Sequence, residues 1–313
     1  MRTTKFLIAA ILLLVFILQG CNNQPRKVKV GYLPMVSSLT HFVAENQGYY
    51  NEEGIEIEAN PIKTSDLIAQ DLVAGHTNVA IELSIVPLLR QNESAPNATK
   101  VFSVSKITGE NGFDGIVVKN DSPYETLEDL SGKKIGVFPG STAKNSLKEI
   151  FVKQFPDLTL PEFVVIDPSL HLQSLESNDV DALFAYEPSL TIGIVKYNFR
   201  KISNSIYAIQ YPSNPIGVAA INTKWLIENP KLANSFVKAI DRAVLFIKEH
   251  PQEARKILAE ATNLEPDVIE RINIMPMSLS TEIDPIHLQG YLKLLKDINE
   301  INTVPNAESF IYK

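Results

Sequence analysis

The chain has 313 residues, a length that suits two average domains, and 45% of them are hydrophobic, so a packed core is expected. Lys and Arg total 29 against 36 Asp and Glu, which gives a net charge of -7. No stretch is dominated by Lys or Arg, so we expect no nucleic-acid partner, because such a partner usually needs a basic face. The single cysteine, Cys21, excludes a disulfide scaffold and a cysteine-based zinc or iron–sulfur site.

The first residues have the features of an export signal. A basic start is followed by an unbroken apolar run over 6–18, which is short for a membrane span. Leu18-Gln19-Gly20-Cys21 resembles the bacterial lipobox, in which signal peptidase II cuts before a lipidated cysteine. We expect residues 1–20 to be a lipoprotein signal peptide, Cys21 to carry the lipid and residues 21–27 to be a tether. The alternative is an uncleaved anchor helix, or an ordinary signal with an unrelated cysteine.

Apolar periodicity and capping residues predict alternating strands and helices. In chain order, the pattern predicts a strand over 28–32, a helix over 42–48, a strand over 55–58, a helix over 67–74, strands over 79–81 and 134–137, a helix over 142–154, a strand over 163–166, a helix over 170–176, a strand over 182–185, and helices over 232–247, 251–261, 266–272 and 285–298. Strand–helix–strand at this pitch predicts parallel βαβ units, and their repetition suggests two α/β lobes of similar build. Segments 115–118 and 217–220 look like crossovers between the lobes.

Catalytic motifs are missing from the sequence. It contains neither Gly-x-Ser-x-Gly nor His-Glu-x-x-His, and the glycine-rich segment 136–142 lacks the lysine of a phosphate loop. The five histidines are scattered without the spacing of metal ligands. We therefore expect no catalytic residue, no metal and no cofactor.

Small polar residues recur in the loops that follow the predicted strands. In an open α/β sheet, ligands bind beyond the carboxyl ends of the strands, and free N–H groups at helix starts suit an anionic or acceptor-rich group. Each serine or threonine taken alone is equally a helix cap, but five such loops from both lobes should converge on one cleft. The candidate ligand-binding residues are Ser38, His41, Ser65, Ser84, Ser141, Thr142, Tyr186 and Glu187.

Two of these candidates have open alternatives. Glu187, pinned between an apolar strand and Pro188, either accepts an N–H or amine of a ligand or forms an inter-lobe salt bridge or a solvated edge. His41 either donates to a ligand or packs near the start of the first helix.

Several ordered motifs carry a family resemblance. They are Val30-Gly31-Tyr32-Leu33-Pro34, Gly48-Tyr49-Tyr50, the segment 129–137, Pro139-Gly140-Ser141-Thr142, and Asp181-Ala182 followed by Tyr186-Glu187-Pro188. Over roughly residues 28 to 250, this set resembles the SsuA/THI5-like (NMT1-like) family of solute-binding proteins for sulfonates, nitrate, taurine and thiamine pyrimidines.

The resemblance implies a fold and a function. The fold would be α/β and periplasmic-binding-protein-like type II, with residues 28–114 and 217–313 in lobe one, 115–216 in lobe two, and two crossover strands joining them. The protein would be the extracytoplasmic, lipid-anchored subunit of an ABC importer. It would act as a monomer, close on a small polar solute and dock on a permease with its ATPase subunit. The eight candidate residues fall at the family's cleft loops. The sequence shows no obvious arginine among them, which argues against a tightly held divalent anion.

The solute class and two rival functions stay open. A sulfonate-, nitrate- or pyrimidine-like solute fits the loops. One rival is a pyrimidine-precursor-forming enzyme of the same fold. It is disfavoured because that group carries a cysteine-rich motif and works inside the cell. The other is a ligand-sensing ectodomain. It is disfavoured because a sensor should continue into a membrane span or a helix-turn-helix, and neither is visible after the apolar run over 6–18.

Overall fold

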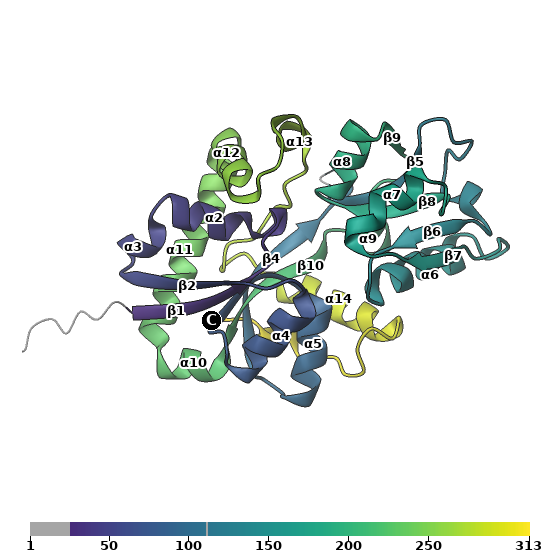
Figure 1. The fold of residues 1–313 in the computed structure, drawn as a ribbon. Helices are drawn as coiled ribbons and strands as arrows, with labels where there is room; N and C mark the ends of the chain where they lie inside the picture. The colour runs from purple at the N-terminus through teal and green to yellow at the C-terminus, as the bar shows by residue number, and fades with distance from the viewer. Residues whose placement is uncertain (1–25, 111) are drawn as a thin grey trace, which may run out of the picture.

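The structure, a computed structural model, describes residues 26–110 and 112–313, and they form two α/β lobes (Figure 1). Each lobe is built on a five-stranded sheet, with strand order β2-β1-β3-β10-β4 in the first lobe and β7-β6-β8-β5-β9 in the second. The first sheet contains β1 (Arg26–Tyr32), β2 (Ile55–Pro61), β3 (Val79–Ser84), β4 (Thr99–Ile107) and β10 (Asn214–Asn222). The second contains β5 (Asp114–Lys119), β6 (Lys134–Val137), β7 (Glu162–Val165), β8 (Ala182–Tyr186) and β9 (Phe199–Lys201).

Helices and 3-10 turns connect and cover these strands. The first lobe carries η1 (Val36–Ser38), α2 (Leu39–Asn46), α3 (Tyr49–Glu52), α4 (Ser65–Ala74), α5 (Ile85–Ser94), α10 (Thr223–Glu228), α11 (Pro230–Glu249), α12 (Pro251–Thr262), α13 (Pro266–Arg271), α14 (Pro285–Asp297) and α15 (Ala307–Phe310). The second carries η2 (Glu128–Leu130), α6 (Thr142–Gln154), η3 (Pro168–Leu170), α7 (His171–Glu176), α8 (Ser189–Lys196) and α9 (Ile206–Gln210).

The expected parallel units are confirmed in both lobes. β1 pairs in parallel with β2 and β3, and β6 pairs in parallel with β7 and β8. Each sheet also contains one antiparallel strand that lies between two strands distant from it in the sequence. β10 lies antiparallel between β3 and β4, and β5 lies antiparallel between β8 and β9.

Most predicted elements are present with small shifts at their ends, as expected for sequence-based boundaries. The long helix α11 buries Leu232, Phe236 and Ile240 on the face that its apolar spacing predicts. The sequence pattern did not reveal β4, β9, α5, α8 and α9, nor the short helices α3 and α15. β4 is hidden because Ser103 and Ser105 interrupt its apolar run, yet both serines are fully buried and hydrogen-bonded in the structure.

Two apolar layers cover the first sheet. Helices α2, α11 and α12 pack on one face, around Val28, Ile81 and Phe236, and α4, α5 and α14 pack on the other (Figure 1). The second lobe buries its own core around Ile135 and Phe184. Ile107, Ile216 and Met275 of the first lobe also pack against this second core, so apolar contacts as well as the chain cross between the lobes.

The chain passes between the lobes twice. One link joins β4, which ends at Ile107, to β5, which begins at Asp114, and the other, over 211–213, joins α9 to β10. Segments 115–118 and 217–220, which the sequence marked as crossovers, lie inside β5 and β10, just beyond these links. Two connections of this kind can act as a hinge between the lobes.

Gly217, in β10, makes a close approach that offers a test of this hinge region. A methyl group there would lie 2.9 Å from Glu82 Oε2 and 3.2 Å from Ser105 Cβ. We expect Gly217→Ala to lower the free energy of unfolding by about 1–3 kcal/mol, because the buried neighbours must shift. Urea unfolding against Gly109→Ala, whose added methyl group would have no neighbour within 4 Å, measures the effect. Equal stability of the two variants would show that β10 tolerates the extra volume.

Candidate functional site

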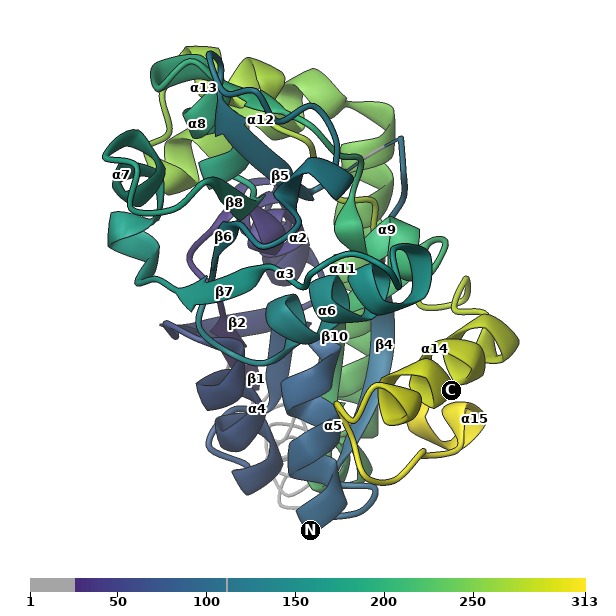
Figure 2. The same ribbon diagram turned by 90° about the vertical axis from the view of Figure 1, so that its right-hand side faces the viewer.

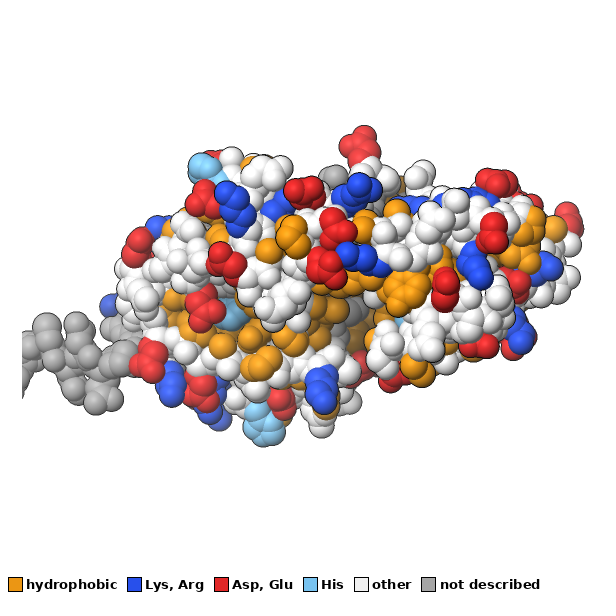
Figure 3. Space-filling view, turned by 45° about the horizontal axis from the view of Figure 1, so that its top comes forward, with side chains coloured by type: hydrophobic (Ala, Val, Ile, Leu, Met, Phe, Trp, Pro, Cys, Tyr) orange, Lys and Arg blue, Asp and Glu red, His pale blue; other side chains and the backbone are white. Residues whose placement is uncertain are grey.

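The loops at the carboxyl ends of the parallel strands meet the opposite lobe. Ser141, after β6, contacts Arg90 and Glu300 of the first lobe, and Glu187, after β8, contacts Asn273 of the first lobe. The candidate site therefore lies along the seam between the lobes. In Figure 3, hydrophobic side chains gather in a hollow in the middle of the molecule, with charged side chains beside it.

The two predicted site residues after β1, Ser38 and His41, are buried. Ser38 is fully buried, and its hydroxyl has no hydrogen-bond partner among the described residues. His41, one turn into α2, is 1% exposed; its Nδ1 lies 3.0 Å from the Tyr50 hydroxyl, and its ring lies 4.6 Å from that of Tyr32. Burial lowers the pKa of His41 to about 4, so the ring is neutral at physiological pH. These contacts correspond to the packing alternative for His41.

Two predicted serines of the first lobe come together. The backbone N–H of Ser84, at the start of α5, donates to Ser65 Oγ at 3.0 Å. The Thr64 hydroxyl accepts from Leu67 N at 3.3 Å and caps α4. Ser65 therefore links the second and third loops, instead of capping its own helix.

The second lobe contributes a stack of rings near the ends of β6 and β8. Phe138 lies between His171, at 4.1 Å, and Tyr186, at 4.9 Å between ring centroids. Tyr186 in turn stacks on Tyr207, and their hydroxyl oxygens lie 2.9 Å apart. Tyr186 thus has its polar group satisfied within the lobe, and Phe138, which sequence reasoning missed, is part of the same wall.

Glu187 is 2% exposed and links the lobes through hydrogen bonds. Its carboxylate accepts from Thr191 N at 3.1 Å, from Thr191 Oγ1 at 2.9 Å and from the backbone N–H of Asn273 at 3.2 Å. Burial raises the pKa of Glu187, and these hydrogen bonds oppose the rise. The contact with Asn273 is a hydrogen bond between the lobes. It joins them as the proposed salt bridge would, but its donor is an uncharged backbone N–H.

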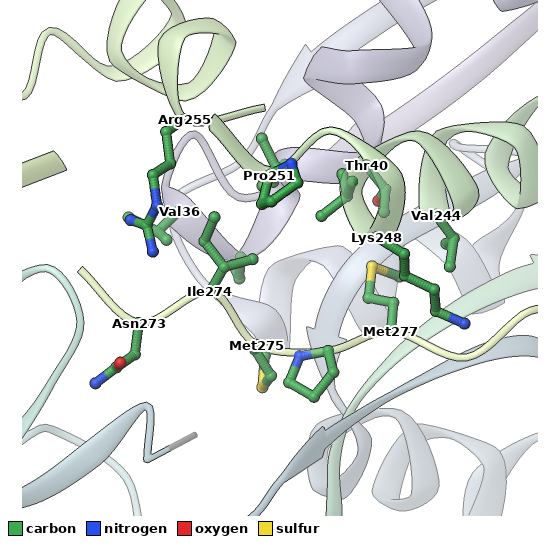
Figure 4. A pocket seen from close by; sticks show the side chains of 14 residues that line it. Val36, Thr40, Val244, Lys248, Pro251, Arg255, Asn273, Ile274, Met275 and Met277 are labelled. Atoms are coloured by element: carbon green, nitrogen blue, oxygen red, sulfur yellow. The ribbon is translucent and has the colours of Figure 1, made fainter. Parts of the chain in front are cut away.

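A pocket of about 270 Å³ lies in the first lobe beside this seam (Figure 4). It is lined by the loop after β1, by one side of α11 and α12, and by the strap 273–277 that includes Asn273. Ser37 and Thr40 both line it, and neither hydroxyl has a partner among the described residues. A buried hydroxyl without a partner lowers stability by about 1–3 kcal/mol. These two groups therefore favour binding of a ligand that can hydrogen-bond to them.

Two cations lie at opposite ends of the pocket (Figure 4). Arg255 donates through Nη1 to the carbonyl oxygens of Ile269 and Ile272, at 2.6 and 2.8 Å, which fixes its guanidinium. Lys248 is exposed and lies 3.2 Å from the carboxylate of Glu282. Most of the remaining lining is apolar, including Met275 and Met277, so the pocket suits a small molecule with both polar and apolar parts.

Glu82 is a buried acid that sequence reasoning passed over. It lies in β3 with φ of 55°, at an irregularity in the pairing with β10, and it is 2% exposed. Ser105 Oγ donates to its Oε2 at 2.5 Å, while Oε1 has no partner among the described residues. Burial raises the pKa of Glu82 to about 8, and the Ser105 hydrogen bond opposes that rise.

Position explains most of what the sequence did and did not reveal about this site. Ser37 and Thr40 flank the predicted Ser38, and a strand-end rule cannot choose among adjacent residues. Glu300 and Asn273 come from C-terminal segments that reach the seam only through tertiary folding. Only Glu82, two residues before Ser84 in β3, carried a signal: an acidic residue near the end of an apolar strand.

Within 26–110 and 112–313, none of the helices combines the length and apolar character needed to cross a membrane. The predicted lipidation site, Cys21, and the predicted signal peptide lie outside these described residues.

Comparison with known proteins places the fold in a family. A family model described as NMT1/THI5 like matches residues 37–254. A protein of Bacillus subtilis (strain 168), whose name describes it as an aliphatic sulfonates-binding protein, is 22% identical over 272 residues, covering 82% of this chain and 79% of its own.

Solved structures agree on the architecture. The periplasmic aliphatic sulphonate binding protein SsuA from Escherichia coli superposes with a TM-score of 0.75 at 14% identity, over 93% of each chain. The desulfurization enzyme DSZB has a TM-score of 0.68 at 15% identity, over 91% of this chain and 96% of its own. The two-lobed fold is therefore shared by binding proteins and at least one enzyme.

Glu82 predicts a pH dependence of stability. Its folded pKa lies above the usual 4.5, so between about pH 5 and pH 8 the folded protein holds a proton that the unfolded chain has released, and stability falls as pH rises. Glu82→Gln removes this titration, so its free energy of unfolding should fall less across the same range, by ~1 kcal/mol per pH unit. Urea unfolding at several pH values measures the difference.

The control for this experiment is Glu260→Gln, which changes an exposed carboxylate on α12. Its profile should run parallel to that of the unmodified protein. A parallel profile for Glu82→Gln as well would mean that Glu82 does not retain its proton in the folded state.

Proposed function

The chain belongs to the NMT1/THI5-like family, and on this basis we propose that it is the extracytoplasmic solute-binding subunit of an ABC importer. The observation that carries the proposal is the pocket beside the inter-lobe seam, with the buried, unpartnered hydroxyls of Ser37 and Thr40. A solute that supplies hydrogen-bond partners to these groups removes an unfavourable desolvation and so gains affinity. We propose that this pocket is the solute site in the first lobe.

The hinge gives binding a mechanical consequence. The two links between the lobes, β4 to β5 and α9 to β10, let one lobe rotate on the other, and a solute shifts the lobes toward closure only if it binds the closed arrangement more tightly. Asn273 lines the pocket and donates hydrogen bonds to Gly112 O and Glu187, at 3.0 and 3.2 Å. The strap 273–277 therefore connects the pocket to the second lobe, and a permease could distinguish the loaded state by the position of that lobe.

The pocket favours binding over turnover. Its lining contains no histidine, cysteine, aspartate or glutamate, so it offers neither a thiol nucleophile nor a carboxylate or imidazole base. Hydroxyls, a fixed guanidinium and an ammonium can hold a small polar solute of the sulfonate, nitrate or pyrimidine type without transforming it. This lining favours a binding protein over the pyrimidine-forming enzyme.

We also propose an anchored location for the protein. Cleavage before Cys21 and lipidation of its thiol would leave the folded body attached to the outer face of the cell membrane by a tether that ends near residue 27. There the protein would act as a monomer beside a permease and its ATPase subunit.

A solute screen tests the proposed function. Sulfonates, nitrate, pyrimidines and small amines are added to the purified mature chain, and the unfolding temperature is measured. A true solute at 100 times its dissociation constant should stabilise the protein by about 2.7 kcal/mol. A panel in which no compound raises the unfolding temperature, or in which the protein converts one of them, would contradict the proposal.

Thr40→Val separates binding from folding in the same screen. Valine keeps the shape of threonine and removes an unpartnered buried hydroxyl, so the unliganded variant should be equally stable or more stable, by up to about 1–3 kcal/mol. Solute affinity should fall at least about tenfold, which corresponds to ~1.4 kcal/mol. Thr159→Val, at an exposed position of the second lobe, is the matched control and should bind normally. Unchanged affinity in Thr40→Val would remove this pocket from consideration.

Cys21→Ser tests the anchor in the native host. Loss of the thiol prevents lipidation, so the protein should move from the membrane fraction to the soluble extracytoplasmic fraction and lose incorporation of labelled fatty acid. Persistence of the variant in the membrane fraction would support the uncleaved anchor helix instead.

A further inference from the structure

Glu300 follows α14 in the C-terminal part of the first lobe, yet its carboxylate is directed at the second lobe. Its side chain has no exposed surface. Arg90, on α5 of the same lobe, donates from Nη2 to Glu300 Oε2 at 2.5 Å and from Nε to Glu300 O at 2.8 Å. The charge of the buried carboxylate is thus compensated by an arginine that moves with it, since both residues belong to lobe one.

The remaining partners of this carboxylate come from α6 of the second lobe. Asn145 Nδ2 donates to Oε1 at 2.6 Å, and the hydroxyls of Ser141 and Thr142 donate to Oε2 at 3.1 and 3.4 Å. Arg90 Nη2 also donates to Ser141 Oγ at 2.8 Å. α6 has thirteen residues and starts at Thr142, so its positive end lies beside the carboxylate. In Figure 2, α5, α6 and the end of α14 lie on the same side of the molecule.

An exposed ion bridge between the lobes provides a comparison. Lys196, on α8, lies 2.5 Å from Glu265 and 3.1 Å from Asp267, but their side chains are 34%, 67% and 49% exposed. Exposed pairs of this kind contribute about 0–1 kcal/mol, because water competes for both partners. Glu300, by contrast, is shielded from water while the lobes are together, and its carboxylate loses three fixed donors and keeps only Arg90 when they part.

We propose that Glu300 is a built-in carboxylate that occupies the donors at the start of α6, thereby holding the two lobes together and excluding a solute anion from these donors. Ser141 and Thr142 are two of the residues from which an anion-binding role was expected. Their hydroxyls, together with Asn145 and the helix start, already bind an anionic group, and the chain itself supplies it.

The exclusion of solute anions rests on the proposed function, whereas the holding of the lobes does not. If a solute is captured at the seam, its acidic group cannot use α6 while Glu300 is in place. Recognition is then left to the pocket near Thr40, and Glu300 restricts the range of solutes that the protein accepts.

Chemical rescue with acetate tests the proposal. Glu300→Ala leaves a gap the size of the lost side chain, and acetate can return a carboxylate to it. Spin labels on Gln70→Cys and Val152→Cys, at exposed positions of α4 and α6, report the distance between the lobes in a Cys21→Ser background. We expect Glu300→Ala to show a longer and broader distance distribution than the parent. Sodium acetate, against sodium chloride at equal ionic strength, should restore the parental distance and raise the unfolding temperature of Glu300→Ala by about 2–4 °C.

Three variants complete the design. Glu300→Gln fills the gap without the charge, so acetate should have no effect on it. Asn145→Ala removes a donor from the second lobe while Glu300 stays, and should lengthen the distance even if Glu300→Ala fails to fold. Lys196→Gln, which breaks the exposed bridge, should leave the distance unchanged.

The outcomes are decisive for each part of the proposal. If Glu300→Ala keeps the parental distance between the labels, Glu300 does not hold the lobes together. If Glu300→Ala does not fold, a parental distance in Asn145→Ala has the same meaning. An opened Glu300→Ala protein that acetate neither closes nor stabilises overturns the carboxylate site. None of these measurements uses a solute, so a failed solute screen would contradict the proposed function and leave this result standing.

Discussion

Buried carboxylates at the seam organise this structure, because a charge removed from water must find donors nearby. Glu300 takes three of its donors from α6 of the opposite lobe, and Glu187 takes one from the strap at Asn273. Glu82, buried within the first lobe, has only Ser105 as a donor, and burial accordingly raises its pKa to about 8. Hydrogen bonds to Glu300 and Glu187 therefore fix the relative position of the lobes, together with the apolar contacts of Ile107, Ile216 and Met275 with the second core.

This division of labour fits a protein of the NMT1/THI5-like family. Each lobe has a complete five-stranded sheet of its own, so the lobes can rotate relative to each other if the contacts across the seam change. The pocket near Thr40 adds hydroxyls that the folded chain leaves unpartnered. Binding would then satisfy groups that folding did not, which is how a solute can favour one arrangement of the lobes over another.

The sequence predicts local structure well and the seam poorly, for a physical reason. Periodicity and capping depend on neighbours in the chain, so the α11 face around Phe236 and the parallel β1, β3 and β6 units were predictable. The antiparallel placement of β10 was not, because it depends on pairing with strands more than a hundred residues away. The same limit applies to the site. The loop after β1 was identified. The two partners of Ser141 were not, because Arg90 and Glu300 lie far from it in the sequence and no local pattern connects them.

The position of β10 also determines when the first lobe can be completed. This strand separates β3 from β4, so those two strands have no direct pairing and the sheet stays unfinished until residue 222 has joined it. The whole second lobe lies between β4 and β10 in the chain and can complete its own sheet earlier. During synthesis the first lobe would thus remain an incomplete sheet until residue 222 is made, and its closure depends on non-local pairing, which is slow.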